Sequence, residues 1–261
     1  MNMRPVIFGE VLFDRFPDGT SVLGGAPFNV AWHLQAFSAK PLFISRVGND
    51  ALGRQIKNAM LDWHMDTAGL QLDSAHPTAT VEVTFPNDEP AYDIVDNRAC
   101  DFINSDFFPP LPESTLLYHG TLALRHNISA TSLEILRQKL STLVFIDINL
   151  RQPWWTKTQV NACLDHCQWV KLNEHELDQI IANQDNNRNK LNSLFDRQAI
   201  TNIVLTAGEK GAIIADRDQN QQSVKPEMSQ QVVDTVGAGD AFSSVILLGI
   251  IKRWPIKLML E

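Results

Sequence analysis

Cysteine, positive charge and long apolar runs are all scarce in this sequence, and each scarcity excludes a class of protein. Three cysteines in 261 residues are too few, and odd in number, for a disulfide framework, which favours a reducing compartment. Acidic residues outnumber basic ones by 30 to 22, so the net charge of −8 opposes binding to nucleic acid or to an anionic membrane. The longest apolar stretch, roughly Ala241 to Ile251, falls well short of the ~20 residues of a membrane span.

Targeting and linker segments are also missing from the sequence. The first five residues run directly into Val6-Ile7-Phe8 without a long apolar segment or a cleavage site, so no signal peptide is visible and we expect a cytoplasmic protein. No internal repeat, low-complexity tract or interdomain linker is evident. We therefore expect one domain over residues 1–261 that binds a small molecule, with neither nucleic acid nor membrane as a partner.

Short β-rich apolar runs alternate with helical patterns along most of the chain. This alternation is typical of a parallel sheet covered by helices, which predicts a doubly wound α/β fold with a mostly parallel sheet. The expected strands are 6–8, 42–44, 116–118, 144–146, 169–172 and 203–205, and the expected helices are 26–37, 51–63, 130–140, 174–182 and 191–198. Polar clusters at 185–190 and 216–222 indicate surface loops.

One region breaks this rhythm. Residues 80–85 and 91–95 each alternate between apolar and polar side chains, and turn-forming residues lie between them. Such a hairpin has one polar face and cannot be an interior pair of parallel strands. We expect a small β lid at about 78–97, with a possible contribution from 12–24; an ordinary antiparallel edge of the main sheet is the alternative.

The segment Asp234-Thr235-Val236-Gly237-Ala238-Gly239-Asp240 precedes an apolar helical pattern. Small residues at 237–239 let the chain turn into a helix with its first amides uncovered, and those amides can hold phosphate oxygens. Asp240 then lies in the first turn, where its carboxylate can accept a proton from a substrate hydroxyl. A plain glycine turn with Asp240 as a first-turn acid is the other interpretation of this spacing.

Two common nucleotide-binding motifs are absent. No G-x-x-x-x-G-K-[ST] sequence occurs, which excludes a P-loop. A dinucleotide fingerprint starting at Gly237 would need glycine at position 242, which is Phe242.

A second glycine cluster precedes the first predicted helix. Gly24 and Gly25 can admit a ligand against the backbone, and Asn29 offers a donor and an acceptor to sugar hydroxyls. Asp14 follows the first strand, at the end where α/β sheets place ligands. Each of these segments can also be a simple turn.

Taken together, the motifs resemble those of the ribokinase-like (PfkB) sugar kinases, and the resemblance spans essentially the whole chain. It is carried by Gly9-Glu10 with Asp14, Gly24-Gly25-Ala26-Pro27-x-Asn29, Val47-Gly48-Asn49-Asp50-x-x-Gly53, Asp147-x-Asn149-x-Arg151, Asn173-x-x-Glu176, Thr206-x-Gly208-x-x-Gly211 and Asp234-Thr235-x-Gly237-Ala238-Gly239-Asp240.

The resemblance implies a role for each matching residue. Asp240 corresponds to the catalytic base, and the amides of Gly237, Ala238 and Gly239 to its anion hole. The implied sugar-binding residues are Asp14, Gly24, Gly25 and Asn29. The implied ATP-binding residues are Lys171, Asn173, Glu176, Thr206, Gly208 and Gly211, with Glu176 ordering Mg²⁺ through water. The resemblance also implies that the hairpin closes over the sugar and pairs with a second subunit in a homodimer.

Two arginines are further candidates for substrate contacts. Arg151 follows a strand end on the expected ATP side and can neutralise phosphate charge. Arg98 follows the hairpin and can reach a substrate carboxylate or phosphate, although an exposed charge is the simpler interpretation. Cys163, His166 and Cys167 have helical spacing, but with no second ligand pair they indicate packing rather than a metal site.

Within the family, the pattern is most similar to fructokinases, which implies ATP-dependent phosphorylation of fructose to fructose 6-phosphate. A 2-keto-3-deoxygluconate kinase, a nucleoside kinase and a non-catalytic sugar-binding protein of the same fold are the alternatives. After the helix that follows Asp240, the sequence is shorter than family members usually are. We therefore expect a truncated monovalent-cation site, weakened ATP binding and a weakened or inactive kinase.

Overall fold

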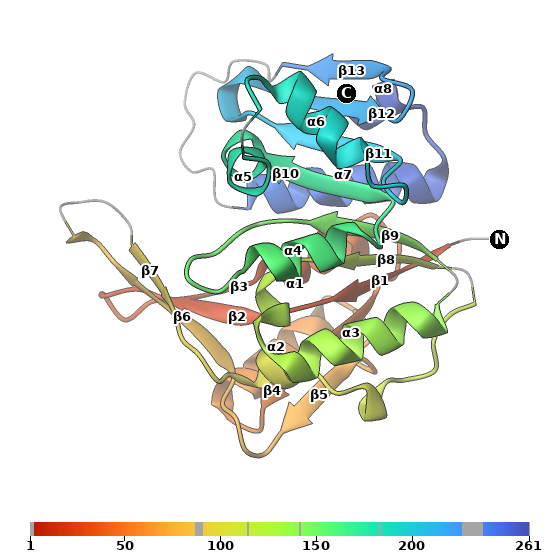
Figure 1. Ribbon diagram of the computed structural model, residues 1–261. Coiled ribbons are helices and arrows are strands. Elements are labelled where there is room, and N and C mark those ends of the chain that lie inside the picture. Colours follow the sequence, from red (N-terminus) through yellow and green to blue (C-terminus); the bar gives the residue numbers. More distant parts are fainter. Residues whose placement is uncertain are drawn as a thin grey trace.

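The computed structural model describes residues 3–86, 91–113, 115–140, 142–182, 184–225 and 237–260. Within these ranges, a nine-stranded sheet runs through the molecule in the order β13-β12-β11-β10-β9-β8-β1-β4-β5 (Figure 1). The strands are β1 (Arg4–Phe8), β4 (Leu42–Gly48), β5 (Leu70–Asp73), β8 (Thr115–His119), β9 (Leu143–Asp147), β10 (Trp169–Asn173), β11 (Asn202–Thr206), β12 (Ala212–Asp216) and β13 (Gln221–Val224).

The sheet is parallel from β5 to β11, which confirms the predicted doubly wound fold. Val6 pairs with Leu42 on one side and with Leu117 on the other, so β1 is a central strand. The last two strands differ, because β12 and β13 are antiparallel to their neighbours. The loop predicted at 216–222 is therefore too long: β12 ends at Asp216 and β13 begins at Gln221, since exposed polar residues on an edge strand resemble a loop in sequence.

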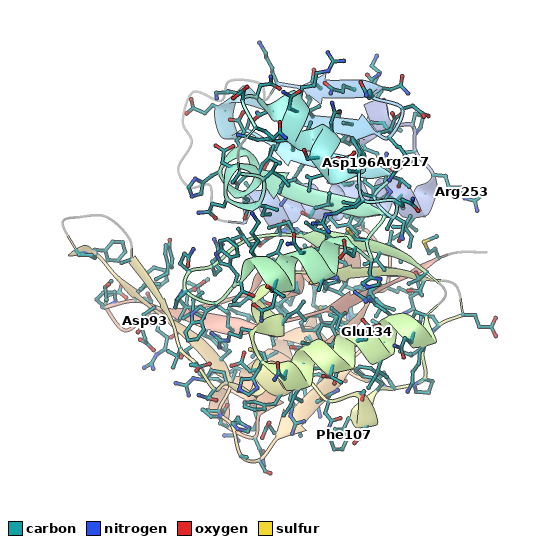
Figure 2. All side chains as sticks on the ribbon, in the orientation of Figure 1. Asp93, Phe107, Glu134, Asp196, Arg217 and Arg253 are labelled. Carbon is teal, nitrogen blue, oxygen red and sulfur yellow. The ribbon has the colours of Figure 1, made fainter. Side chains whose placement is uncertain are left out.

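Helices cover both faces of the sheet. One face packs against α1 (Ala26–Ala36), α2 (Ala51–Asp62), α7 (Ala238–Lys252) and α8 (Ile256–Leu260). The other packs against α3 (Asn127–Lys139), α4 (Lys157–Leu164), α5 (Glu174–Ile180) and α6 (Asn187–Phe195). Successive strand residues enter opposite cores: Ile7 and Phe43 face α1, whereas Phe8 and Ile44 face α3. Figure 2 shows side chains filling both layers.

Two local predictions on the α3 face concern the start of α6 and the cysteines. α6 begins at Asn187, inside the predicted loop 185–190, because the Asn186 side chain accepts a hydrogen bond from the Asn189 amide and caps the helix. Cys163 and Cys167 are buried free thiols in the apolar core. Among the described residues, no group of three or more His, Cys, Asp or Glu side chains could hold a metal ion.

A second sheet projects from the side of the main one, at the left of Figure 1. This small sheet has the order β3-β2-β6-β7, with β2 (Leu12–Arg15), β3 (Ser21–Gly24), β6 (Ala79–Thr84) and β7 (Ala91–Ile94). The middle strands β2 and β6 are parallel although they lie far apart in sequence. The strands of the predicted hairpin thus belong to a separate sheet; residues 87–90 of its turn lie outside the described ranges.

The strand order locates the position at which a ligand can bind. The chain moves from β1 to β4 in one direction, and from β8 to β9 in the other. In open α/β sheets, ligands bind beyond the carboxyl ends of the strands where the direction reverses. That position lies beyond Phe8 and His119, beside the small sheet. As a separate finding, no helix in the described ranges has the length and apolarity needed to cross a membrane.

Candidate active site

A cavity of about 450 Å³ lies at this position, between the carboxyl ends of the main strands, the starts of α1 and α7, and the small sheet. Many of the residues predicted from sequence line it together: Asp14, Gly25, Asn29, Arg151, Lys171, Asn173, Glu176, Thr206, Gly237, Gly239 and Asp240. The small sheet contributes Leu12, Val81, Tyr92 and Ile94 as well as Asp14. Segments from both ends of the sequence thus form one chamber.

Five predicted site residues do not line this cavity: Gly24, Arg98, Ala238, Gly208 and Gly211. A Cβ atom on Gly24 would lie 3.3 Å from the Asp14 carboxylate, so this glycine supports the cavity wall from behind. The Arg98 backbone amide donates a hydrogen bond to Asp101 at 2.9 Å. Asp234, Thr235 and Val236 of the sequence motif lie outside the described residues.

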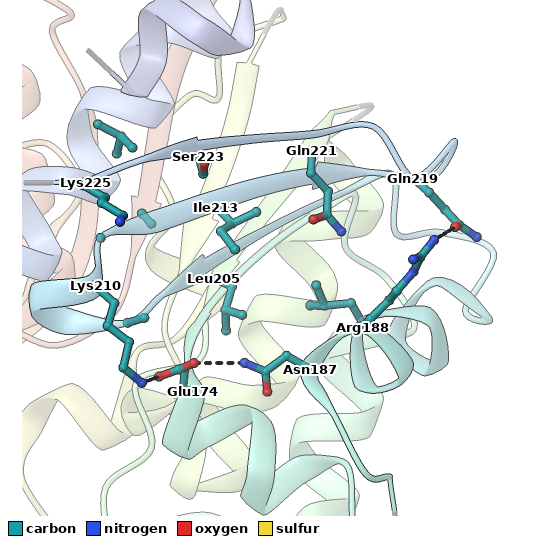
Figure 3. A pocket seen from close by; sticks show the side chains of 15 residues that line it. Glu174, Asn187, Arg188, Leu205, Lys210, Ile213, Gln219, Gln221, Ser223 and Lys225 are labelled. Atoms are coloured by element: carbon teal, nitrogen blue, oxygen red, sulfur yellow. Dashed lines mark hydrogen bonds and ion pairs between the residues drawn. The ribbon is translucent and has the colours of Figure 1, made fainter.

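Gly211 lines a second groove, of about 570 Å³, between α6 and the outer strands β11, β12 and β13. Figure 3 shows that Lys210 and Asn187 both point toward Glu174, at 3.1 and 2.9 Å respectively. Gly211 has a φ of +98°, and a Cβ there would lie 1.9 Å from the Val224 carbonyl oxygen. Glycine at this position therefore lets β12 and β13 approach one another.

The start of α1 is fixed by close packing of the backbone. Gly25 caps the helix with a φ of +105°, and a Cβ there would lie 2.9 Å from the Glu10 carbonyl oxygen. Only glycine allows this approach without strain. The chain that follows β1 is therefore pressed against the first turn of the helix, and Asn29, one turn later, faces the cavity.

The start of α7 is open. Gly237 is the N-cap, with a φ of +78°; among the described residues no side chain caps the first turn, and a Cβ on Gly237 would meet no atom within 4 Å. No side chain of the described residues therefore accepts from the first amides of α7, and the positive end of the helix dipole favours an anion beside them. The phosphate pocket predicted from the sequence would lie at this helix start, and its role stays a prediction.

Asp240 and Asn29 meet across the cavity. The Asn29 Nδ2 group donates a hydrogen bond to Asp240 Oδ2 at 2.8 Å, which joins α1 to α7. Burial raises the pKa of Asp240, and the Asn29 hydrogen bond opposes that rise. An oriented carboxylate with a raised pKa is a better proton acceptor than an exposed aspartate.

A buried polar network beneath α7 supports this first turn. Asp147 Oδ2 accepts hydrogen bonds from Lys171 Nζ and Ser243 Oγ, both at 2.7 Å. Ser243 also donates to the Gly239 carbonyl at 3.0 Å. The network therefore connects the ends of β9 and β10 to the turn that carries Asp240. Neither Asp147 nor Ser243 was predicted as a site residue; the position of Asp147 at a strand end was the available signal.

Asn173 and Glu176 form a reciprocal cap at the start of α5. Asn173 Oδ1 accepts from the Glu176 amide, and Glu176 Oε2 accepts from the Asn173 amide, each at 2.8 Å. Glu176 Oε1 accepts from the Leu150 amide at 2.9 Å, and burial raises the pKa of this carboxyl. Each carboxylate oxygen keeps a lone pair, which suits contact with a hydrated cation.

Glu10 is a cavity residue to which the sequence analysis gave no role. Its side chain is 3% exposed, and its Oε2 atom has no hydrogen-bond partner among the described residues. Burial raises the pKa of Glu10 to about 7; its own backbone amide opposes the rise, and the charge of Asp240 adds to it. Its position directly after Gly9, at the end of β1, was the signal that could have identified it.

Arg151 is exposed in the loop after β9 and lines the same cavity. Burial raises the pKa of Asp14, and the positive charge of Arg151 partly offsets this rise. The arginine is thus within electrostatic range of the predicted sugar-binding carboxylate.

Comparison with known proteins identifies the family of this chain. The sequence matches the profile of the pfkB family carbohydrate kinases over residues 7–261. It is 30% identical over 265 residues to a fructokinase from Klebsiella pneumoniae, covering 96% of this chain and 85% of the relative. It is also similar to the crystal structure of fructokinase from Vibrio cholerae O395 in its apo form, with a TM-score of 0.86 and 29% identity over 96% of this chain and 90% of that one.

A second crystal structure of the Vibrio cholerae fructokinase contains fructose, ADP and a calcium ion. It matches with a TM-score of 0.85 and 28% identity, covering 96% of this chain and 84% of that one. This chain belongs to the pfkB family of carbohydrate kinases, which are phosphotransferases that act on hydroxyl groups.

Proposed function

We propose that this protein transfers the γ-phosphoryl group of ATP to a primary hydroxyl of a ketose, converting fructose to fructose 6-phosphate. The observation that carries the proposal is the 2.8 Å hydrogen bond between Asn29 and Asp240 beside the open start of α7. It sets a proton acceptor next to an anion-binding helix end, which is the pair of groups that phosphoryl transfer to an alcohol requires.

In this mechanism Asp240 is the general base. Its carboxylate accepts the proton of the attacking hydroxyl while Asn29 holds the carboxylate in place. The amides of Gly237, Ala238 and Gly239 then face the negative charge that builds up on the transferred phosphoryl group. The hydrogen bond from Ser243 to the Gly239 carbonyl keeps this turn in position during the reaction.

The charges of the cavity support a neutral sugar as the acceptor. Five acidic side chains line it, Glu10, Asp14, Asp147, Glu176 and Asp240, against the basic Arg151 and Lys171. Lys171 is already paired with Asp147 at 2.7 Å. Asp14 and Asn29 can bind sugar hydroxyls, whereas a sugar acid such as 2-keto-3-deoxygluconate would bring its carboxylate into an acidic chamber. Fructose has no such group.

The nucleotide is assigned to the side of the cavity formed by the ends of β10 and β11. Lys171, Asn173, Glu176 and Thr206 line the cavity there, and Gly208 and Gly211 shape the turn after β11. Asn173 and Glu176 offer the oxygen donors that Mg²⁺ prefers, with water and phosphate oxygens completing its shell. When bound, the ion would neutralise charge on the ATP phosphates.

The small sheet is assigned the role of a lid, because it supplies one wall of the cavity. Large apolar side chains are exposed on it and beside it: Val22 of β3 is 53% exposed, and Phe85, directly after β6, is 49% exposed. Such side chains favour a contact with a second copy, so we propose a homodimer formed through the small sheet. The three buried free thiols fit a reducing, cytoplasmic location.

An ADP-release assay over a panel of sugars tests the proposal. Fructose, other ketohexoses, 2-keto-3-deoxygluconate and adenosine are compared by kcat/KM with ATP and Mg²⁺ in excess. We expect fructose to rank first. An acidic sugar or a nucleoside that exceeds fructose by about tenfold, the scale on which a few pocket contacts discriminate, would overturn the assignment.

A further inference from the structure

The guanidinium of Arg125, at the end of η4 (Leu122–Arg125), is buried where the small sheet joins the rest of the molecule. Its side chain is only 4% exposed, and its partner Asp101 is 1% exposed. Arg125 Nε donates to Asp101 Oδ1 at 2.7 Å, and Nη2 donates to Asp101 Oδ2 at 2.8 Å. This two-point contact fixes the plane of the guanidinium, which a lysine ammonium would not do.

A third hydrogen bond ties Arg125 to the small sheet. Nη2 also donates to the Val95 carbonyl at 2.8 Å, and Val95 is the residue directly after β7. The Val95 amide in turn donates to the Thr80 carbonyl of β6 at 3.3 Å. Arg125 therefore holds the point at which the chain leaves the small sheet.

A ring contact connects Arg125 to the turn that carries Arg151. The Arg125 guanidinium carbon lies 4.5 Å from the ring centroid of Trp154. The Trp154 amide donates to the Arg151 carbonyl at 2.8 Å, and Arg151 lines the cavity. One buried cation thus contacts both the exit of the small sheet and the turn that carries Arg151.

The apolar base of the small sheet packs around the same tryptophan. Trp154 lies against a cluster of buried side chains formed by Leu12, Ala79, Val81, Ile94, Cys100 and Leu122. Leu12, Val81, Ile94 and Leu122 of this cluster also line the cavity. A displacement of the tryptophan or of Val95 would therefore move cavity walls directly.

We infer that Arg125 is a positioning residue for sugar phosphorylation. It holds the small sheet in the position in which Leu12, Val81 and Ile94 cover the bound sugar. The inference rests on the proposed function, in which the small sheet is a lid. Arg125 itself does not line the cavity, so it acts through Val95 and Trp154 and contacts neither the sugar nor ATP.

A lid that is held less firmly captures sugar poorly and admits water. The predicted signature is a higher KM for the sugar, little change in the KM for ATP, and more ADP release in the absence of sugar. A purely structural ion pair would lower stability without this change of pattern.

The chain contains a matched control for the experiment. Arg46 forms a second buried pair, with its Nε 2.8 Å from Asp73 Oδ2, and it also hydrogen bonds a carbonyl, that of Phe102, at 3.0 Å. Its guanidinium carbon lies 5.6 Å from the ring centroid of Phe107. Neither Arg46 nor Asp73 lines the cavity. Arg46→Gln therefore removes a similar group away from the site.

The experiment compares Arg125→Gln, Arg125→Lys and Arg46→Gln with the wild-type chain, below the lowest thermal midpoint of the set. We expect Arg125→Gln to raise the KM for fructose about tenfold or more and to raise sugar-independent ADP release severalfold, with the KM for ATP within about twofold. Arg125→Lys should restore part of the sugar affinity. Arg46→Gln should leave both KM values unchanged.

Several outcomes would overturn the inference. If Arg125→Gln and Arg46→Gln lower the thermal midpoint alike and neither changes the KM for fructose, Arg125 is a structural residue only. If Arg125→Gln does not fold, Trp154→Leu is measured in its place and must also raise the KM for fructose, by a smaller factor. If it does not, the inference fails. A wild-type chain that phosphorylates no ketose overturns the proposed function, and the inference with it; an active wild type with an unaffected Arg125→Gln overturns the inference alone.

Discussion

The two helices that meet at the cavity both begin after a glycine, but for different physical reasons. At α1, a side chain on Gly25 would lie 2.9 Å from the Glu10 carbonyl oxygen. At α7, a side chain on Gly237 would meet no atom of the described part of the chain within 4 Å. One helix start is closed by the protein itself, whereas the other leaves its amides open. The same sequence signal therefore marks a packing constraint in one place and a binding position in the other.

The polar side chains of the two helices also have different roles. Asn29 on α1 donates the hydrogen bond, and Asp240 on α7 accepts it. An amide can orient its partner but cannot accept a proton at neutral pH, whereas the carboxylate can do so. The comparison assigns positioning to α1 and chemistry to α7, and it can be tested by changing one helix at a time.

The largest effect is expected from Asp240→Asn. Removing a general base costs roughly 10²–10⁴-fold in rate, so kcat should fall by about that factor while calorimetry still detects sugar binding. Asn29→Ala is the matched change on α1 and should cost far less in kcat. Equal losses in the two variants would contradict the division of roles between the helices.

The next effect separates the two glycines. Gly25→Ala introduces both an unfavourable φ and a clash with backbone, so we expect it to lower the free energy of unfolding by about 3 kcal/mol. Gly237→Ala meets open space and bears only the cost of its positive φ, roughly 1 kcal/mol. Urea unfolding of both variants checks the order. A Gly237→Ala variant that is the less stable of the two would mean that the start of α7 is packed rather than open.

The free energy of unfolding should also depend on pH, because Glu10, which contacts the start of α1, titrates. Its pKa in the folded protein, about 7, lies above its ordinary value of 4.5. The neutral carboxyl therefore contributes stability that is fully present below pH 4.5 and is lost as the pH rises through 7. Glu10→Gln does not titrate, so its stability relative to wild type should grow by about 3 kcal/mol between pH 4 and pH 8.

Urea unfolding of wild type and Glu10→Gln at the two pH values measures this difference directly. Because the same pair is compared at each pH, the titration of carboxyls that do not interact with Glu10 cancels; that of Asp240, whose charge acts on Glu10, does not. If the difference in the free energy of unfolding stays constant between the two pH values, Glu10 is hydrated in the folded protein. Water then reaches the part of the cavity beside the start of α1.

The smallest expected effect is a shift in the pH dependence of kcat/KM in the Asn29→Ala variant. Asp240 must be ionised to act as the base, so kcat/KM falls as the pH drops through its pKa. The Asn29 hydrogen bond lowers that pKa, and its removal should raise it. The acid limb of the profile should therefore move to higher pH. An unmoved limb would mean that the limiting group is not Asp240.

Local patterns in the sequence predicted most of the fold, because buried parallel strands and amphipathic helices carry strong signals. The edge hairpin of β12 and β13 was not predicted, because exposed strand residues such as Gln221 and Gln222 resemble a loop in sequence. The start of α6 escaped because an asparagine-rich segment suggests a turn, although Asn186 acts there as a helix cap. In both places the decisive fact is a tertiary or capping contact rather than composition.

The site was predicted where one segment contains the whole signal, as in the turn at 237–240. Glu10, Asp147 and Ser243 were missed because their roles depend on contacts between segments that the sheet brings together. The same dependence on tertiary contacts distinguishes two arginines, Arg98 and Arg125. Arg98 was a candidate in the sequence and Arg125 was not, because only the fold shows that Arg125 pairs with Asp101 and reaches Val95. The substrate contact assigned to Arg98 stays a prediction.

The small sheet is built from two pieces of chain, β2 with β3 and β6 with β7, joined through the parallel pairing of Asp14 with Val81. It therefore cannot be excised or transplanted as one continuous insert. A chimera that exchanges acceptor preference between relatives must carry both pieces, with crossover points on either side of the intervening β4 and α2. A recombinant that takes only one piece would pair strands of different ancestry in the middle of the sheet.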